Sequence, residues 1–123
     1  MQEIAQSLLN VPYQWGGRSP MGMDCSGFTQ VVFKILGKKL LRDAWQQAEQ
    51  GVLVNFIEEI QPGDLVFFDN EEGRIIHVGI ALANHKIIHA SGCVRIDNLD
   101  HHGIYNTETR KYSHNLRIIK RVL

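Results

Sequence analysis

The chain has 123 residues with 13 basic and 13 acidic side chains, so its formal net charge is zero when its six histidines are neutral. This length fits one domain, and 44% hydrophobic against 21% charged residues allows a buried core and excludes a disordered chain. The balanced charge argues against nucleic acid as a partner. Neither a membrane span nor a secretory signal peptide is expected in this chain, because its apolar runs are short and no leader pattern opens it. We therefore expect a single domain over residues 1–123.

A short helix and a turn-rich segment are predicted at the start of the chain. Apolar side chains within residues 4–9 have helical spacing, and Pro12 ends that pattern. Residues 11–23 then contain Pro20 and three glycines, and are expected to form turns.

The clearest predicted helix follows Asp24, which is a good N-cap residue. An apolar stripe within residues 28–36 marks its buried face, and Gly37 is placed to end it. A weaker helix is predicted over residues 43–50, with Gly51 after it.

The pattern changes to strands after Pro62-Gly63. Short turns rich in Gly, Asn or Asp separate five candidate strands and suit antiparallel neighbours. These candidates are residues 64–68, 75–82, 86–91, 94–96 and 116–122. Helices followed by an antiparallel sheet predict an α+β fold.

Cys25 is the candidate nucleophile. It stands in the first turn of the clearest helix, where unpaired backbone N–H groups and the helix dipole are expected to favour a thiolate. A lone cysteine is more often an inert buried residue, but the polar and small neighbours Asp24, Ser26 and Gly27 suit a reactive thiol. Cys93 has no such context and is interpreted as structural. The two cysteines form no CxxC pair, so neither a disulfide framework nor a zinc ribbon is indicated.

A cysteine nucleophile needs a base and a group that orients the base, and two histidines downstream can supply them. Strict alternation in residues 75–82 predicts that Ile76 faces the core while His77 and Gly79 face the other way, where small residues leave space beside the imidazole. A three-residue loop at 83–85 would set Gly79 opposite His89. His77 and His89 would then be diagonal neighbours on one face, within hydrogen-bonding reach.

Other readings of these residues stay open. His85, His101, His102 and His114 are expected to be merely exposed or packed. A metal site built from Cys25, His77 and His89, with or without Cys93, is conceivable, although its spacing matches no zinc signature, and no metal is predicted.

Five motifs follow one another along the chain: YQWGG at 13–17, GMDCSGF at 22–28, PGDLVFF at 62–68, HVGI at 77–80 and IHAS at 88–91. With these motifs in this order, the chain resembles the NlpC family of murein peptidases, which are papain-like cysteine peptidases of bacterial cell-wall peptides. This resemblance implies a papain-like fold with N-terminal helices packed on the sheet. It also implies Cys25 as nucleophile, His77 as base and His89 as the residue that orients His77. The implied reaction needs no cofactor.

The resemblance implies further roles around the nucleophile. Tyr13 corresponds to a tyrosine near the oxyanion site, whose hydroxyl would donate to the developing negative oxygen. Asp24 and Ser26 match positions that contact the substrate backbone and its amine. Arg42-Asp43-Ala44 resembles a substrate-contacting stretch, in which Ala44 stands where a hydroxyl is usual. Ser91 completes the implied substrate-binding set.

Residues 91–97 (SGCVRID) most resemble the branch that cuts between γ-D-glutamate and the diamino acid of released murein peptides. That branch usually carries SH3-like domains, so this chain is expected to be an excised catalytic domain or to differ in selectivity. The implied setting is a bacterial cytoplasm or cell envelope. The imidazolium–thiolate pair would make activity fall both as acid protonates Cys25 and as base deprotonates His77. A papain-like amidase or acyl transferase and a silent murein-binding module remain as alternatives.

Overall fold

A computed structural model describes residues 1–19 and 22–123. Pro20, which was expected to lie in the turn-rich segment, falls outside these residues. The helices are α1 (Gln2–Ser7), α2 (Cys25–Ile35), α3 (Ala44–Gln47) and the 3-10 turn η1 (Ile57–Glu59). No helix in the described part of the chain is long and apolar enough to cross a membrane.

The strands come almost entirely after the helices. They are β1 (Arg18–Ser19), β2 (Gly22–Met23), β3 (Val52–Val54), β4 (Leu65–Asp69), β5 (Ile75–Leu82), β6 (Lys86–Ser91), β7 (Cys93–Asp100), β8 (Gly103–Asn106) and β9 (Lys111–Arg121). Every ladder between them is antiparallel. The predicted α+β class is therefore confirmed.

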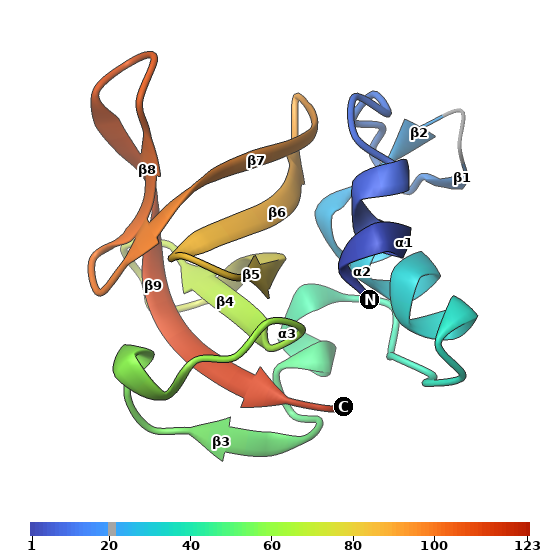
Figure 1. Ribbon diagram of the computed structural model, residues 1–123, viewed down its shortest axis with the longest axis horizontal. Coiled ribbons are helices and arrows are strands. Elements are labelled where there is room, and N and C mark those ends of the chain that lie inside the picture. The colour runs from blue at the N-terminus through green and yellow to red at the C-terminus, as the bar shows by residue number, and fades with distance from the viewer. Residues whose placement is uncertain (20–21) are drawn as a thin grey trace.

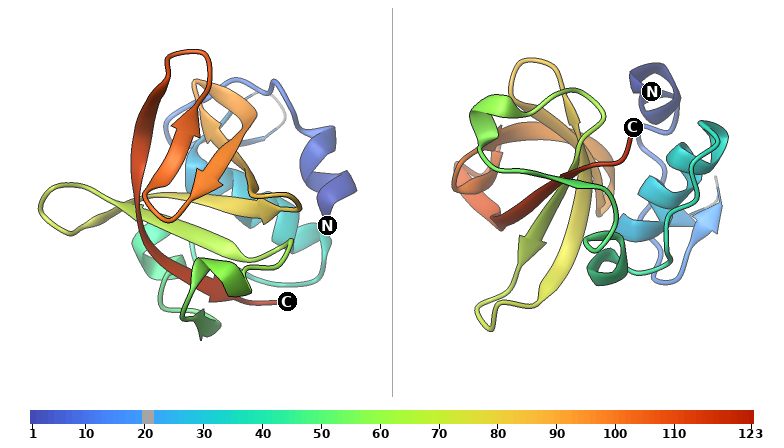
Figure 2. Two further views of the ribbon diagram at one scale, coloured as in Figure 1. Left: turned by 60° about the vertical axis from the view of Figure 1, so that its left-hand side comes forward. Right: turned by 90° about the horizontal axis from the view of Figure 1, so that it is seen from below.

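The long strand β9 closes the main sheet on itself. The strand order is β3-β9-β4-β5-β6-β7-β8, and β8 pairs with β9 as well. The first part of β9 pairs with β8, and its later part pairs with β4 and β3. Strands β4 to β9 therefore form a barrel with β3 outside it. Figure 1 shows the barrel strands on one side and α1 and α2 on the other, and Figure 2 shows how the strands curl around.

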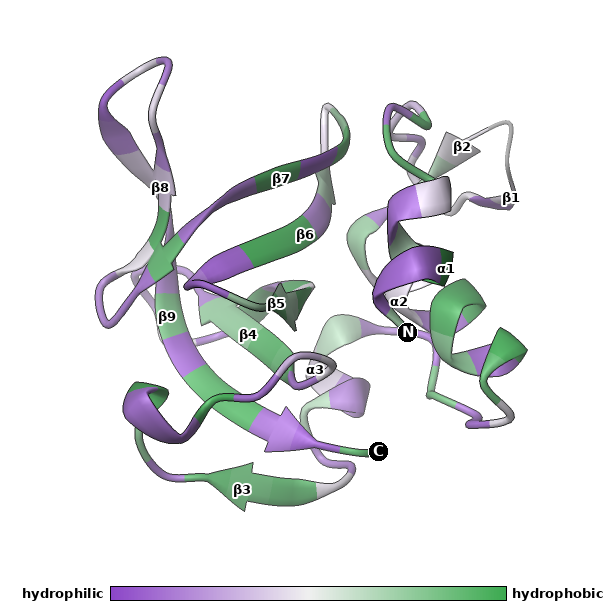
Figure 3. Ribbon diagram, in the orientation of Figure 1, coloured by the Kyte–Doolittle hydropathy of each residue, from purple (hydrophilic) through white to green (hydrophobic). Residues whose placement is uncertain are grey.

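Two apolar clusters lie on the two faces of the barrel wall. One packs α2 against the outer side chains of β4, β5 and β6, with Phe28 and Phe67 fully buried in it. The other fills the barrel and includes Phe68 and Ile87. Both faces of β4 are thus covered, and Figure 3 accordingly shows β4 as almost continuously apolar, whereas β9 alternates.

Most predicted elements form, but several boundaries move. Strands 75–82 and 86–91 are correct, and the strand predicted at 94–96 extends over all of β7. The helix predicted over 43–50 contains only α3, because the chain leaves the helix after Ala48 and turns toward β3. Strands β1 and β2 were missed because they lie in the segment that was expected to form turns. Strands β3 and β8 were also missed: both are short, and β3 pairs only with distant β9, whereas β8 pairs with its chain neighbours β7 and β9.

Candidate functional site

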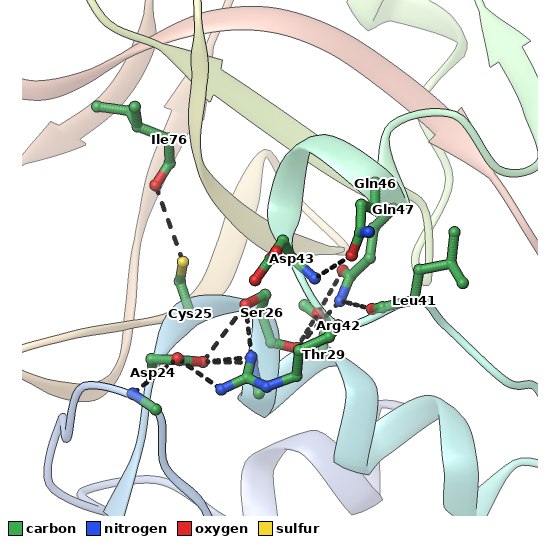
Figure 4. A network of polar contacts seen from close by, with 12 residues as sticks. Asp24, Cys25, Ser26, Thr29, Leu41, Arg42, Asp43, Gln46, Gln47 and Ile76 are labelled. Carbon is green, nitrogen blue, oxygen red and sulfur yellow. Dashed lines mark hydrogen bonds and ion pairs between the residues drawn. The ribbon is translucent and has the colours of Figure 1, made fainter.

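Cys25 is the first residue of α2, directly after the Asp24 N-cap. A side-chain oxygen of Asp24 accepts the backbone N–H of Gly27 at 2.6 Å, which fixes the start of the helix. The partly exposed Cys25 points its sulfur toward β5, where Sγ lies 4.0 Å from the Ile76 carbonyl oxygen (Figure 4). The Val78 backbone also interacts with this sulfur. The nucleophile therefore lies against the backbone on both sides of His77.

The ionisation of Cys25 differs from the sequence-based expectation. Burial raises the pKa of the thiol, and the backbone N–H groups of Val78 and Ser26 offset this only in part. The nearby Asp24 carboxylate raises the pKa further. The helix start therefore does not by itself produce a thiolate here, because burial opposes it.

His77 and His89 form the expected diagonal pair. The β5–β6 register places Gly79 opposite His89 across the loop at 83–85, as predicted. Nε2 of His77 and Nδ1 of His89 are 2.8 Å apart, and both side chains are buried. Burial, followed by the neighbouring His114 and His89, lowers the pKa of His77 well below its ordinary value. The base is thus a neutral imidazole at neutral pH.

Two predictions about β5 were wrong. Ile76, predicted to face the core, is 54% exposed, because the β4–β5 ladder is irregular beyond Phe68. The space expected beside His77 is also filled: a Cβ on Gly79 would come within 2.6 Å of Ile87 and 3.0 Å of His89. The glycine serves close packing of the two strands.

Sequence reasoning missed Asp97 as a partner of His89. Nε2 of His89 lies 2.7 Å from Oδ2 of Asp97. Arg95 in turn donates two hydrogen bonds to that carboxylate, at 2.9 and 3.1 Å. Burial raises the pKa of Asp97, but the hydrogen bonds from His89 and Arg95 outweigh it and the net shift is downward. The motif SGCVRID contained both residues, yet only the observed extent of β7 puts them beside His89.

His114 on β9 was expected to be simply exposed or packed, and it packs against the candidate base. Its ring stacks on His77 with centroids 4.0 Å apart and an interplanar angle of 20°. Burial, and after it the nearby His89, lowers the pKa of His114 to about 4. The other three histidines with that expectation, His85, His101 and His102, are exposed.

The candidate ligands for a metal ion are the rings of His77, His89 and His114. In the described part of the chain, the ligand atoms of His77, His89 and His114 lie within 4.8 Å of one another, and neither cysteine joins them. An ion held by His77 and His89 together would displace the 2.8 Å hydrogen bond between them. The observed geometry is a hydrogen-bonded relay.

Tyr13 lies beside the nucleophile, at the turn between β6 and β7. Its backbone N–H donates to the Gly92 carbonyl, and the preceding Pro12 bridges to Cys93. Burial raises the pKa of the Tyr13 phenol, and the charges of Cys25 and Asp24 raise it further. Ser91 is half-buried at the start of the same turn. The turn thus brings Ser91 and Tyr13 into one neighbourhood.

Asp24 and Ser26 belong to a dense polar network (Figure 4). Both Asp24 oxygens accept hydrogen bonds from Arg42, at 3.2 and 2.8 Å, and Oδ2 also accepts the Gly16 N–H. Arg42 reaches the Ser26 hydroxyl at 3.0 Å. Burial raises the pKa of Asp24, but the hydrogen bonds from Arg42 and Gly27 produce a net downward shift.

Asp43 and Ala44 lie at the start of α3, in the neighbourhood of this network. The exposed Asp43 is the N-cap, and its backbone N–H donates to Gln46 at 3.1 Å. Ala44 is buried. The fully buried Gln47 donates to the Ser26 carbonyl and accepts the Thr29 hydroxyl, so it joins α3 to α2.

Residues 10–113 of the chain match the NlpC/P60 family. The chain is 44% identical over 84 residues to the gamma-D-glutamyl-L-lysine dipeptidyl-peptidase of Bacillus subtilis (strain 168), which covers 67% of this chain and 28% of that protein. It is 42% identical over 93 residues to the probable endopeptidase NlpC of Escherichia coli (strain K12), which covers 74% of this chain and 60% of that protein.

Solved structures agree with these sequence matches. The crystal structure of an NlpC/P60 family protein from Bacillus cereus ATCC 10987 has a TM-score of 0.82 and 32% identity, and covers 97% of this chain and 38% of that one. The chain spans only about a quarter of the two dipeptidyl-peptidases it matches, 28% and 25% of their lengths. Since the family match extends over most of its residues, this chain belongs to the NlpC/P60 family.

Proposed function

We propose that this domain is a cysteine peptidase that hydrolyses the bond between γ-D-glutamate and the diamino acid of bacterial cell-wall peptides. One observation supports it most: the Cys25 sulfur lies against the backbone on both sides of His77, and the His77 ring is hydrogen-bonded to His89. A nucleophile, a base and an orienting group are the parts that such chemistry needs. The substrate class comes from the name of the 44% identical relative. The proposal includes a papain-like arrangement, in which the N-terminal helices pack on the sheet.

The first half of the reaction forms a thioester. The Cys25 thiol gives its proton to His77 as the sulfur attacks the γ-D-glutamyl carbonyl carbon. Tyr13 and the Cys25 backbone N–H donate hydrogen bonds to the oxyanion. His77 then protonates the amine of the diamino acid as the C–N bond breaks.

Water completes the turnover. His77 removes a proton from water, the resulting hydroxide attacks the thioester carbon, and the C–S bond breaks to release the γ-carboxylate peptide. The proton on His77 returns to the sulfur, so the enzyme ends as it began. Because burial raises the pKa of Cys25 and lowers that of His77, each proton moves during attack and not beforehand.

Substrate contacts are proposed for the polar rim of this site. Ser26 and Ser91 would contact the peptide, and Asp24 would favour its ammonium group, although Arg42 already holds both Asp24 oxygens. Asp43 would also contact the peptide, because it is exposed at the start of α3, whereas the neighbouring Ala44 is buried. Ala44 offers no hydroxyl, so whatever that group binds in relatives is lost here.

We also propose that the chain works as the catalytic part of a longer bacterial protein, with SH3-like domains elsewhere, in the cytoplasm or cell envelope. The two dipeptidyl-peptidases that it matches are bacterial, and the match covers only 28% and 25% of their lengths, which supports this. A silent murein-binding module, or an amidase or acyl transferase on the same core, would be the alternative.

The decisive test compares the wild type with Cys25→Ala and Cys93→Ala. Each is incubated with L-Ala-γ-D-Glu-L-Lys, with the diaminopimelate analogue and with amino-acetylated versions, and products are identified by mass spectrometry. We expect cleavage by the wild type and by Cys93→Ala, and none by Cys25→Ala. Adding a free amine should yield no amide product, which separates hydrolysis from acyl transfer. Binding of the peptides without cleavage by any variant would instead establish the binding module.

A further inference from the structure

We propose that Asp97 is a positioning residue that sets the tautomer of His89, and through it leaves the lone pair of His77 on Nδ1. This inference rests on the proposed function for its meaning in catalysis, but its main readouts need no substrate. The observation behind it is a chain of three contacts, from Arg95 to Asp97, from Asp97 to His89 and from His89 to His77.

The Asp97 carboxylate determines which nitrogen of His89 carries the proton. Asp97 is buried and ionised, so it can only accept hydrogen bonds. Nε2 of His89, 2.7 Å away, must therefore carry a hydrogen and donate it. In a neutral ring only one nitrogen is protonated, so Nδ1 of His89 is an acceptor.

The second proton follows from the first. Nδ1 of His89 lies 2.8 Å from Nε2 of His77, and an accepting Nδ1 requires a donating Nε2. A neutral His77 then has its lone pair on Nδ1, the nitrogen that is free to take a proton from a thiol. With the opposite tautomer of His89, the proton of His77 would stand on Nδ1 and block that transfer.

Burial makes this arrangement depend on Asp97. His89 is 1% exposed, so water has little access to replace a lost acceptor. Arg95 holds the carboxylate from the outer side with two hydrogen bonds, which fixes its direction toward His89. Removal of Asp97 would leave His89 with no charged partner to select between its tautomers.

The test uses Asp97→Leu, which is similar in shape and accepts no hydrogen bond, and Asp97→Ala as a second variant should leucine impair folding. Asp100→Asn, on the same strand and bonded to Tyr112 and the His102 N–H, is the matched control. Two-bond ¹H–¹⁵N spectra report the protonation of each imidazole nitrogen in the free protein. Alkylation of Cys25 by iodoacetamide, followed against pH, reports on the thiol and its base.

In the wild type and in Asp100→Asn, we expect both His89 and His77 to carry hydrogen on Nε2 alone. The Asp97 variants should give mixed tautomers at both rings, a shifted alkylation profile and a fall in kcat of about 10- to 100-fold with little change in KM. A doubly protonated or Nδ1–H His89 in the wild type overturns the proposal. So do wild-type tautomers and alkylation in a folded Asp97→Leu. Correct tautomers in a protein that cleaves nothing would instead count against the peptidase function alone.

Discussion

The ring of His114 lies parallel to that of His77 at a centroid separation of 4.0 Å, and the two histidines come from strands that are distant in sequence. Phe68 lies near both rings, with centroids 5.7 Å from His77 and 5.9 Å from His114. The candidate base is thus held by His89 at its edge and by His114 on its face. Because β9 closes the barrel next to β4, the same closure that buries Phe68 also positions His77.

The two stacked rings predict a loss of stability in mild acid. Burial lowers the pKa of both His77 and His114, the latter to about 4. The unfolded chain therefore binds more protons between about pH 6.5 and pH 4, and the free energy of unfolding falls as pH falls through that range. It is fully retained above pH 6.5. Urea denaturation at a series of pH values measures this slope.

His114→Phe removes the titration of His114 and also the part of the lowered pKa of His77 that His114 causes. The phenyl ring keeps a face against His77 but does not titrate, so we expect the slope between pH 6.5 and pH 4 to fall to about half or less. The groups that face His114 electrostatically, His89 and Asp97, are unchanged in this variant. His102→Phe, at an exposed position, serves as control. An unchanged slope in His114→Phe would show that His114 does not resist protonation.

The raised pKa of Cys25 predicts how the thiol reacts. Iodoacetamide attacks the thiolate, so its rate should keep rising above pH 9 and show no plateau in weak acid. Cys25→Ser, which retains only Cys93, gives the background rate. A plateau that begins near pH 5 would establish a preformed imidazolium–thiolate pair, as the sequence alone suggested, and would contradict the burial argument.

Tyr13→Phe tests the oxyanion role of the phenol. Loss of one hydrogen-bond donor to the oxyanion should lower kcat by about 100-fold and leave KM nearly unchanged, since the ground-state carbonyl gains little from that donor. Because Tyr13 is 37% exposed, the fold should tolerate the change. Tyr112→Phe, on β9, is the matched control. Equal kcat values for Tyr13→Phe and the wild type would reduce Tyr13 to a packing residue.

The local parts of this site could be predicted from sequence. The β5–β6 hairpin follows from strict alternation and a three-residue loop, in which Asn84 and His85 adopt positive φ. The Asp24 cap follows from residue type and the helical stripe after it. Both depend on neighbours within a few residues, and that made the Cys25, His77 and His89 assignment possible.

The nonlocal parts could not be predicted. His114 reaches His77 only because β9 pairs with both β4 and β8, each ladder with an irregular step in its register. Asp97 reaches His89 only because β7 continues beyond the apolar residues that marked it. The pKa of Cys25 depends on how deeply α2 packs against β5. Neither these two contacts nor the pKa of Cys25 can be predicted from a short window of sequence.

Gln47→Leu should destabilise the link between α2 and α3. The amide of Gln47 is fully buried and bonds the Ser26 carbonyl, the Leu41 carbonyl and the Thr29 hydroxyl. Leucine would remove all three of these bonds and leave the Thr29 hydroxyl and the Ser26 carbonyl paired only with each other. We expect a cost of about 2 to 3 kcal/mol in the free energy of unfolding. Gln50→Leu removes bonds to Leu41 and Lys39 near the surface and should cost less than about 1 kcal/mol. Equal urea midpoints for the two variants would refute this difference.

Asp24→Asn separates the structural and the substrate role of Asp24. The amide keeps an oxygen for the Gly27 N–H, but it leaves the charge of Arg42 uncompensated. That charge would repel a substrate ammonium, so the ratio of kcat/KM for free-amine over acetylated peptide should fall about tenfold. The free energy of unfolding should also fall by about 1 to 3 kcal/mol, because a partly buried ion pair loses one member. An unchanged ratio with reduced stability would mean that Asp24 only holds α2, Gly16 and Arg42 together, and that amine selection lies elsewhere.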